Sequence, residues 1–383
     1  MMIKNNNRKI NLLILTDTFV AGVGGSERHL RSIIQYLPEE KYNISVVQLF
    51  SHINPELEKI HNNLFSKGNL SLFHFPVGRI YGLNFFRVIF EVIKVVNNAK
   101  IDIVLSFHEK SDILAALIPK SLKRISSRRD MLINPSPFLL YLRKLLVKRF
   151  DLICAPCRAI LDHVAQIEPI DGIPQEVIFN GLDLERFSPK VAPAEDVLAL
   201  KGDSVAGVMV ANFHAVKGHH FFLHAVKELK NAFPALKTFF VGIDKGELKH
   251  INDTIYQLNL GENIINLGHR TDIPNVLRAC DFIISASYSE GLSNSLIEGI
   301  ACGLPGIATD VGGNSEIIYH NINGYLVASG NELQMIEALK KLVGSLKMRS
   351  VLGKRSREIA KKKFDIRKNI IKYDLLFQKM CEL

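Results

Sequence analysis

The stretch from 281 to 318, DFIISASYSEGLSNSLIEGIACGLPGIATDVGGNSEII, constrains the fold of this chain more than any other. Its first residues form an apolar run that is too short for a helix and is bounded by small polar residues, which predicts a buried parallel strand. In an open α/β sheet, ligands bind outside the carboxyl ends of the strands, so the loop after this strand is expected to line a binding crevice. The residues expected there are Ser287, Glu290, Gly291, Leu292 and Ser293.

Residues 294–302 are predicted to form a helix directly after this loop. The first N–H groups of a helix have no partner within the helix, so this N-terminus favours an anion in the crevice. Glu298 lies on the first turns of the helix and is expected to face the same way as Glu290. A Gly-Leu-Pro turn ends the helix, a strand follows up to Ala308, and the Val-Gly-Gly-Asn turn at 311–314 begins a further helix.

Two glutamates with seven residues between them prove little by themselves, because a Glu on a helix usually lies on a solvated face. Here Glu290 and Glu298 lie between a buried strand and a Gly-Leu-Pro turn, which resembles the Glu-x7-Glu signature of family 4 of the retaining glycosyltransferases, or group 1 glycosyltransferases. The segment SEGLSNSLIEGIACGLP at 289–305 is similar to the most specific stretch of that family. The resemblance implies the GT-B fold, an α/β architecture in which two Rossmann-like domains with parallel sheets face each other across a cleft.

The rest of the chain agrees with this architecture, because β-rich apolar runs alternate with helical segments as in βαβ units. At 383 residues, 47% hydrophobic and 22% charged, the chain can hold two sizeable domains. We expect an N-terminal acceptor domain at 1–187, a C-terminal nucleotide-sugar donor domain at 188–365, and a last helix at 366–383 that crosses back to the first domain. The other predicted strands are 10–16, 44–50, 101–107, 151–155, 176–179, 205–211, 238–242 and 324–327, and the other predicted helices are 85–97, 137–151, 272–280, 331–343, 346–363 and 366–382.

Segments of the first half resemble parts of the family's site. The glycines of the turn at 21–28 follow the first strand and let the backbone approach an anion at a helix start. The resemblance implies that Gly24 and Gly25 lie beside the donor diphosphate. It also implies that His108, at the end of a predicted strand, lies against the transferred sugar, and that residues 125–130 line the acceptor side. A lone His is more often structural or solvated than catalytic, so the role of His108 rests on the resemblance.

In the second half, Lys217 lies at a strand end beside a helix start, where its charge can neutralise a phosphate. The family usually carries an Arg at the position of Asn212, and His214 is expected to replace it in part. The segment Asn-Leu-Gly-His-Arg at 266–270 resembles the loop that meets the nucleotide base through its backbone. The resemblance therefore implies a donor-binding set of Gly24, Gly25, Asn212, His214, Lys217, Gly268, His269, Arg270, Glu290, Gly291, Leu292, Ser293 and Glu298.

The resemblance also implies a division of roles among these residues. Glu298 would accept hydrogen bonds from the ribose hydroxyls, and Glu290 would hold hydroxyls of the donor sugar near the anomeric carbon. The implied catalytic residues are Glu290, His108 and Lys217. The chain contains no Asp-x-Asp, the usual metal-binding pair of the other large glycosyltransferase fold, so no metal is expected. Lys217 and the helix-start amides would then supply positive potential where charge develops on the leaving group.

The expected function is transfer of a sugar from a nucleotide sugar, a UDP-sugar on family frequency, to a glycan or lipid-linked acceptor. The resemblance implies retention of anomeric configuration and a place in bacterial-type surface polysaccharide, lipopolysaccharide or glycolipid synthesis. No cofactor is expected, because the nucleotide sugar is a substrate. Two alternatives remain open: a GT-B enzyme that epimerises or phosphorolyses sugars, and a nucleotide-sugar-binding subunit without turnover.

The formal net charge of +10 indicates an anionic partner. No nucleic-acid-reading motif accompanies the charge, so an anionic membrane face or a pyrophosphate-linked lipid acceptor is favoured. The predicted helix at 137–151 either lies on such a membrane or packs its Leu face on the sheet and solvates its charges, and both alternatives remain open. Its cations are Arg143, Lys144, Lys148 and Arg149, and its apolar residues include Phe138, Leu139, Leu142, Leu145 and Leu146.

We expect a cytoplasmic protein, with any attachment to the inner face of the membrane peripheral, because no segment reaches eighteen uncharged apolar residues. Five cysteines without framework spacing fit a reducing compartment. Cys154 and Cys157 also fit a thiol redox pair, but a structural role is favoured because nothing else indicates a thioredoxin fold. The N-terminal apolar run lacks a small-residue cleavage site and is expected to be the first strand.

Overall fold

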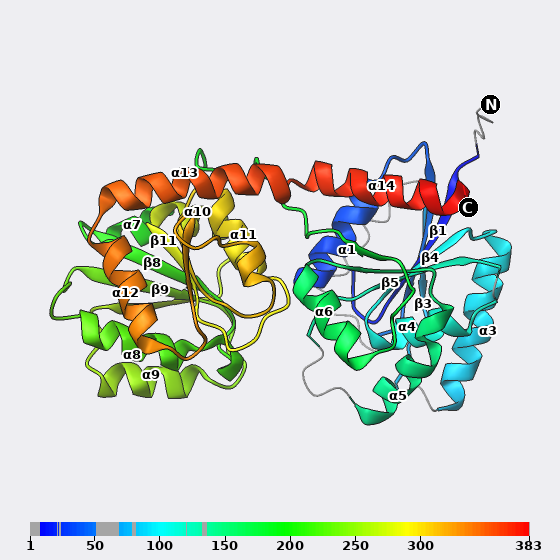
Figure 1. Ribbon diagram of the computed structural model, residues 1–383, viewed down its shortest axis with the longest axis horizontal. Coiled ribbons are helices and arrows are strands. Elements are labelled where there is room, and N and C mark those ends of the chain that lie inside the picture. Colours follow the sequence, from blue (N-terminus) through cyan, green and yellow to red (C-terminus); the bar gives the residue numbers. More distant parts are fainter. Residues whose placement is uncertain are drawn as a thin grey trace. The chain divides into compact units, whose positions relative to one another are not determined.

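The computed structural model describes residues 8–20, 22, 24–50, 69–78, 82–119, 121–131 and 136–382. The chain divides into two compact units. Unit 1 comprises Met1–Gly181 and Arg367–Leu383, and unit 2 comprises Leu182–Ile366. Each unit contains one parallel sheet with helices between its strands (Figure 1), as the alternation of apolar runs and helical segments predicted.

The sheet of unit 1 has the order β3-β2-β1-β4-β5-β6-β7. Its strands are β1 (Ile10–Thr16), β2 (Tyr42–Gln48), β3 (Leu70–His74), β4 (Ile103–Phe107), β5 (Lys123–Ser127), β6 (Leu152–Ala155) and β7 (Gln175–Val177). β1 pairs in parallel with β2 on one side and β4 on the other, so the order reverses between β1 and β4. Every residue of β4 is buried, as expected for a strand covered on both faces.

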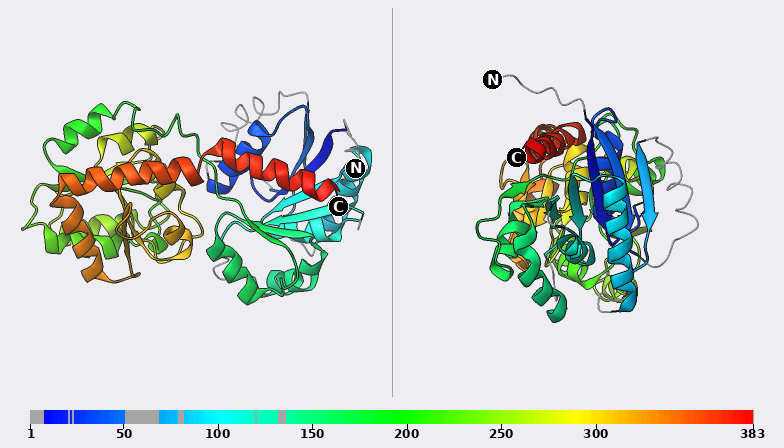
Figure 2. Two further views of the ribbon diagram at one scale, coloured as in Figure 1. Left: turned by 45° about the horizontal axis from the view of Figure 1, so that its top comes forward. Right: turned by 90° about the vertical axis from the view of Figure 1, so that its right-hand side faces the viewer.

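The helices of unit 1 cover both faces of this sheet. They are α1 (Gly25–Tyr36), α3 (Leu83–Asn98), α4 (Glu109–Leu117), α5 (Pro137–Leu146), the 3-10 turn η1 (Val147–Arg149), α6 (Arg158–Ile167) and α14 (Ile366–Glu382). Apolar residues of α3 and α4 share a core with β1 and β4. The last helix is tied to the start of the chain, because His29 Nε2 lies 2.9 Å from the Tyr373 hydroxyl and the Tyr42 hydroxyl donates to Asp374 at 2.6 Å. The first strand and the last helix therefore lie in one unit (Figure 2).

The sheet of unit 2 has the order β10-β9-β8-β11-β12-β13, which reverses between β8 and β11. Its strands are β8 (Val205–Val210), β9 (Leu236–Val241), β10 (Ile264–Gly268), β11 (Phe282–Ser285), β12 (Gly306–Thr309) and β13 (Gly324–Val327). Its helices are α7 (Glu195–Lys201), η2 (Ala215–Lys217), α8 (His219–Leu229), α9 (Leu248–Gln257), α10 (Ile273–Ala279), α11 (Asn294–Ala301), η3 (Gly312–Glu316), α12 (Glu332–Val343) and α13 (Leu346–Lys363). Phenylalanines of α8, β9 and β11 form the centre of its core, among them Phe222, Phe240 and Phe282.

The boundary between the units lies a few residues before the one predicted at 187. Residues 182–187 belong to unit 2, because the Leu182 N–H donates to the Phe364 carbonyl at 2.7 Å and the Arg357 guanidinium donates to the carbonyls of Leu184 and Phe187, both at 2.8 Å. Two predicted helices also differ: the turn at 311–314 begins only the short 3-10 segment η3, and the helix at 137–151 ends at Leu146 before η1. Among the described residues, no helix has both the length and the apolar character needed to cross a bilayer.

Candidate active site

The predicted site residues of each unit lie at the place where the strand order of its sheet reverses. In unit 2 the loops after β8 and β11 carry Lys217 and Glu290, and in unit 1 the loops after β1 and β4 carry Gly24 and His108. Adjacent loops diverge at such a reversal and leave a crevice at the carboxyl ends of the strands. Each unit therefore offers one ligand-binding edge.

In unit 2, the structure brings Lys217 and Glu290 into direct contact. The Lys217 ammonium lies 2.7 Å from Glu290 Oε1, and the Ser287 hydroxyl donates to the same oxygen at 2.7 Å. Both charged side chains are partly exposed, at 26% for Lys217 and 13% for Glu290. A cation and a carboxylate are thus held at the surface of the crevice, where each can exchange its partner for a group of a ligand.

Two glycines allow the loops that carry this pair to approach each other. Gly218 has φ +70°, and a Cβ there would lie 1.9 Å from the Ala286 carbonyl oxygen. Gly312 has φ +51°, and a Cβ there would lie 1.7 Å from the Glu290 carbonyl oxygen. Both positions therefore require glycine for backbone conformation and for space. Main-chain hydrogen bonds complete the packing, from Tyr288 to Val216 at 2.8 Å and from Gly313 to Gly291 at 2.7 Å.

Glu298 lies on α11, the helix that follows the Glu290 loop. The Ser293 hydroxyl caps this helix by accepting from the Leu296 N–H at 3.4 Å, a normal use of Ser at an N-cap. Leu292 and Ser293 are both buried, and Glu298 is only 3% exposed. Glu298 is therefore buried within unit 2, and its contact with the ribose hydroxyls stays a prediction.

Asn212 and His214 lie on the loop after β8, where the Asn212 side chain binds the segment after β9 and the His214 side chain binds its own loop. Asn212 Oδ1 accepts from the Ile243 N–H at 3.1 Å, and His214 Nδ1 accepts from the Val216 N–H at 3.2 Å. His219, which sequence analysis did not single out, is buried next to Lys217 with its ring against Phe213. Burial lowers the pKa of His219 to about 4, so this ring is neutral near pH 7 and adds no charge.

The segment at 266–270, expected to be a loop, begins within β10, and only His269 and Arg270 follow the strand. Gly268 has φ +63° and its carbonyl accepts from the Gly242 N–H at 2.9 Å, while His269 is exposed. The Arg270 guanidinium is bound to the carboxylates of Asp272 at 2.7 Å and Asp196 at 2.5 Å. The side chain of Arg270 therefore stabilises this segment through its ion pairs. The predicted contact of Arg270 with the nucleotide base is left to its backbone groups.

In unit 1, Gly24 is the N-cap of α1 and Gly25 is its first residue. The residues Ala21 and Val23 of the predicted turn lie outside the described residues. A Cβ at Gly24 would lie 2.2 Å from Glu27 Oε2, so the Glu27 carboxylate folds back over the helix start. An acid at this position interacts favourably with the helix dipole and occupies the place expected for a ligand anion.

His108 has an unusual backbone conformation at the end of β4. Its φ of 75° with ψ of 179° lies in a region that non-glycine residues rarely adopt, and such strain costs about 1–3 kcal/mol. Asp17 stabilises this junction, because its carboxylate accepts from the N–H groups of Lys110 at 2.8 Å and Ser111 at 2.7 Å. Burial raises the pKa of Asp17, and the nearby His108 opposes this rise. Asp17 directly follows the first strand, a signal that sequence analysis did not use.

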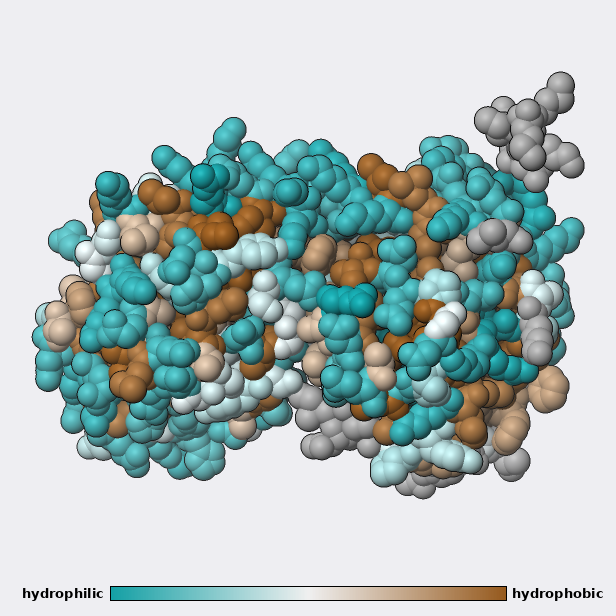
Figure 3. Space-filling model, in the orientation of Figure 1, coloured by the Kyte–Doolittle hydropathy of each residue, from teal (hydrophilic) through white to brown (hydrophobic). Residues whose placement is uncertain are grey.

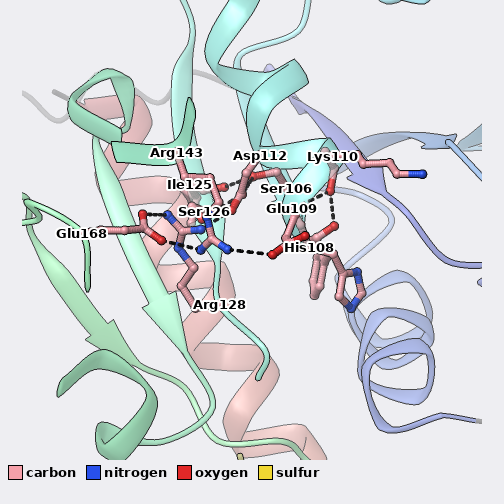
Figure 4. Close-up of polar contacts among 12 residues, drawn as sticks. Ser106, His108, Glu109, Lys110, Asp112, Ile125, Ser126, Arg128, Arg143 and Glu168 are labelled. Atoms are coloured by element: carbon pink, nitrogen blue, oxygen red, sulfur yellow. Dashed lines mark hydrogen bonds and ion pairs between the residues drawn. The ribbon is translucent and has the colours of Figure 1, made fainter. Parts of the chain in front are cut away.

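Behind His108 lies a buried arginine–acid network, formed by Glu109, Asp112, Arg128, Arg143 and Glu168. Arg128 binds Asp112 at 2.5 Å and Glu168 at 2.8 Å, and Arg143 binds Glu168 at 2.7 Å and approaches Glu109 at 3.7 Å. Figure 4 shows the two arginines between Glu168 and the acids of α4, with the His108 ring directed away from them. Burial alone would lower the pKa of Arg128, but Asp112 and Glu168 outweigh it and hold that pKa above its usual value.

Arg128→Ala is expected to lower the free energy of unfolding by about 3–5 kcal/mol, because it leaves the buried Asp112 without its cation and Glu168 with Arg143 alone. Urea unfolding of the variant measures this loss. The matched control is Arg158→Ala, which breaks the exposed pair with Asp162 at 3.0 Å and is expected to cost only about 0.3–0.5 kcal/mol. Equal losses in the two variants would contradict a structural role for the network.

The network corrects our interpretation of the helix at 137–151. Arg143 is 4% exposed and belongs to the network, so it is unavailable to a membrane. Leu139, Leu142 and Leu146 pack against the core of unit 1. The large side chains that remain outside are Phe138 at 48%, Tyr141 at 59% and Leu145 at 59% exposed.

The cysteine pair has no redox-site character. Cys154 and Cys157 are both buried, and burial raises the pKa of Cys154 to about 11. A thiol of this kind is unreactive, since the thiolate is the nucleophile. The structural role favoured for this pair fits these surroundings.

Comparison with known proteins identifies the family. The model described as "Glycosyl transferases group 1" matches residues 194–359, and that described as "Glycosyltransferase Family 4" matches residues 23–186. The chain belongs to the group 1 glycosyltransferases of family 4. The GGSE turn and the Glu-x7-Glu stretch of this glycosyltransferase lie within the matched segments.

Among curated relatives, the Escherichia coli UDP-Gal:alpha-D-GlcNAc-diphosphoundecaprenol alpha-1,3-galactosyltransferase is 30% identical over 54% of this chain and 55% of its own length. The chain therefore spans about half of that relative. A Campylobacter jejuni relative is 26% identical over 92% of this chain and 96% of its own length. Its name is N-acetylgalactosamine-N,N'-diacetylbacillosaminyl-diphospho-undecaprenol 4-alpha-N-acetylgalactosaminyltransferase.

Solved structures support the fold. Anabaena HepE, crystallised with UDP, is 18% identical, with a TM-score of 0.83 and coverage of 97% of this chain and 100% of HepE. A glycosyltransferase from Rickettsia africae is 19% identical, with a TM-score of 0.84 and coverage of 97% of this chain and 98% of that one. Together with the two parallel sheets, these neighbours show the GT-B fold that the sequence predicted.

Proposed function

We propose that this protein is a retaining, metal-independent glycosyltransferase that moves a hexose from a UDP-sugar to a glycan or lipid-linked acceptor in surface polysaccharide or glycolipid synthesis. The observation that carries the proposal is the contact of Lys217 with Glu290, positioned by Ser287 where the second sheet reverses its order. A nucleoside diphosphate needs a cation near its phosphates, and a transferred sugar needs an acceptor for its hydroxyls. The paired side chains provide one of each.

In this proposal Lys217 stabilises the negative charge that develops on the leaving diphosphate, and Glu290 orients the donor sugar. Glu298 holds the ribose hydroxyls, and the exposed His269 and Gly268 lie on the loop that meets the base. His108 keeps its proposed role toward the transferred sugar, and its unusual backbone conformation at the end of β4 sets the direction of its Cα–Cβ bond. The E. coli relative is named for a UDP-sugar donor, which favours UDP over other nucleotides.

A panel of UDP-, GDP- and ADP-sugars in a thermal-shift assay tests the donor, because a ligand at one hundred times its Kd stabilises by about 2.7 kcal/mol. Radiolabelled donor with diphosphate-lipid acceptors then tests transfer. A labelled glycolipid product supports the proposal. Release of a sugar phosphate, epimerisation of the free donor, or donor binding without turnover would each replace it with one of the alternative functions.

We also propose a peripheral contact with an anionic membrane through α5. Phe138, Tyr141 and Leu145 are spaced so that they share one exposed face, and Lys144 and Lys148 are exposed beside them. Figure 3 shows apolar side chains reaching the surface along the part of unit 1 formed by α3 and α5. Exposed aromatic residues next to cations fit the interface between headgroups and acyl chains.

The double variant Lys144→Gln, Lys148→Gln is expected to lower partitioning to anionic vesicles about thirtyfold at low salt, since each cation near such a surface contributes about 1 kcal/mol. Co-sedimentation at low and high salt measures the change. The control variant, Lys347→Gln with Lys354→Gln, removes the same charge from exposed positions of α13 and should partition like the parent. Equal loss in both variants would show that net charge, and not the cations of α5, determines partitioning. Binding that does not depend on salt would contradict an electrostatic contact with the membrane.

A further inference from the structure

Three arginines surround a small cavity in unit 1, and only two of them are neutralised. The cavity of about 20 Å³ is lined by residues that include His108, Arg128, Arg129 and Arg143. Arg128 and Arg143 bind the carboxylates of the arginine–acid network. Arg129 has no carboxylate within ion-pair distance among the residues that the structure describes.

The contacts of Arg129 leave part of its guanidinium unused. Nη2 donates to Asn180 Oδ1 at 2.5 Å, and the group lies 5.7 Å from the centre of the Phe107 ring. Nε and Nη1 are buried and have no hydrogen-bond partner in the described part of the chain. Burial lowers the pKa of Arg129, whereas the carboxylates hold the pKa of Arg128 above its usual value. Arg128 is therefore surrounded by carboxylates that stabilise its charge, whereas for Arg129 the loss of hydration dominates.

A buried guanidinium without a counter-charge is unfavourable, because it stays protonated in proteins and loses its hydration. Nε and Nη1 lie on different edges of the planar guanidinium, and one of them, together with the second N–H of Nη2, forms a fork that matches two oxygens of a phosphate. Arg129 follows β5, and His108 follows the adjacent strand β4, so the unused fork and the proposed catalytic histidine lie at the same edge of the sheet. Arg129 and His108 also line the same cavity.

We propose that Arg129 binds a phosphate oxygen of the acceptor, and that the acceptor is therefore a glycan linked to its carrier through a phosphate or diphosphate. This inference rests on the proposed glycosyl transfer. The donor's own diphosphate is assigned to Lys217 and to the helix starts at Gly24–Gly25 and Leu292–Ser293, and that set does not include Arg129. The names of the E. coli and C. jejuni relatives contain diphosphate-linked lipids, which agrees with this chemistry.

Steady-state kinetics of Arg129→Gln with paired acceptors tests the assignment. One acceptor carries GlcNAc on an alkyl diphosphate, and the other carries GlcNAc on a neutral alkyl chain. We expect the variant to raise KM for the diphosphate acceptor about tenfold or more, and to leave KM for the neutral acceptor and for the donor unchanged. Arg129→Lys keeps the charge and loses the fork, so its KM for the diphosphate acceptor should lie between those of the parent and Arg129→Gln.

The outcomes separate this inference from the proposed function. Equal losses with both acceptors would show a structural role, and a higher donor KM would show that Arg129 serves the donor phosphates, so either result overturns the inference. Transfer to both acceptors with no effect of the variant also overturns it. Absence of transfer from any donor to any acceptor, in contrast, contradicts the proposed function itself.

Binding of an alkyl diphosphate without a sugar gives a readout that does not depend on the acceptor's identity. Calorimetric titration is done without lipid and with UDP at saturation, so that neither a phospholipid headgroup nor the donor site contributes. The parent and Arg158→Gln, a change at an exposed arginine, should bind alike, and Arg129→Gln should lose binding about tenfold or more. Its unfolding midpoint should fall only slightly, because the substitution removes the hydrogen bond to Asn180 and the contact with the Phe107 ring but breaks no ion pair. A lower midpoint with unchanged binding would overturn the inference.

Discussion

Lys217→Ala is expected to lower turnover by about 10²-fold or more, because it removes the cation that the proposed donor site directs at the leaving diphosphate. The loss should exceed that from an ordinary lysine, since the substitution also leaves Glu290 with the Ser287 hydroxyl as its one remaining side-chain partner among the residues that the structure describes. A cation fixed in place before the reaction stabilises developing charge without reorganisation. Initial rates at saturating donor and acceptor measure this effect separately from binding.

The chain offers a matched control for this variant. Lys201 lies 2.7 Å from Asp281, with side-chain exposures of 17% and 22%, so the pair is comparable to Lys217 and Glu290 at 26% and 13%. It lies at the opposite end of the sheet, because Asp281 precedes β11 and accepts from the Ala206 N–H at 2.8 Å. Lys201→Ala should keep normal turnover. Near-normal kinetics of Lys217→Ala, or equal losses in both variants, would remove Lys217 from the diphosphate site.

The regular elements that the sequence predicted have local signals, whereas others, such as β3, β5 and α6, were not predicted. The strand 324–327 and the helices 346–363 and 366–382 occur at the predicted residues, and most other predicted elements differ by one or two residues at an end. An apolar run of strand length and a helical periodicity are each patterns among residues close together in the sequence. The Glu-x7-Glu stretch that indicated the family is a local pattern of the same kind. A point where the strand order reverses is expected in an open parallel sheet of this kind, and the ligand-binding loops are expected there.

The pairings between distant residues could not be predicted in the same way. Lys217 and Glu290 were assigned to separate groups of the ligand, and their direct contact depends on how two loops seventy-three positions apart meet. Arg143 was expected on an exposed face, either against a membrane or in solvent, because a charged residue on an amphipathic helix usually lies there. Its partner Glu168 ends a different helix, so only the folded chain shows that this arginine is buried.

The two glutamates of the signature should respond differently to substitution. Glu290→Ala is expected to lower turnover about 10²-fold with little change in nucleotide affinity, because its partner is the transferred sugar. Glu298→Ala is expected to weaken binding of UDP about tenfold or more, since each lost hydrogen bond to a charged group is worth about 1.5–3 kcal/mol. The positions differ as these roles require: Glu290 is partly exposed on a loop, and Glu298 is 3% exposed on α11.

Calorimetric titration with UDP and rates at saturating donor separate the two effects. Glu298→Gln keeps the volume of the buried side chain, so it distinguishes a lost carboxylate from a cavity in α11. Ser287→Ala tests the positioning of Glu290 and should lower turnover in the same direction but less, because only one hydrogen bond to Glu290 is lost. If both alanine variants lost nucleotide affinity equally and kept the same turnover at saturation, the division of roles between Glu290 and Glu298 would be wrong.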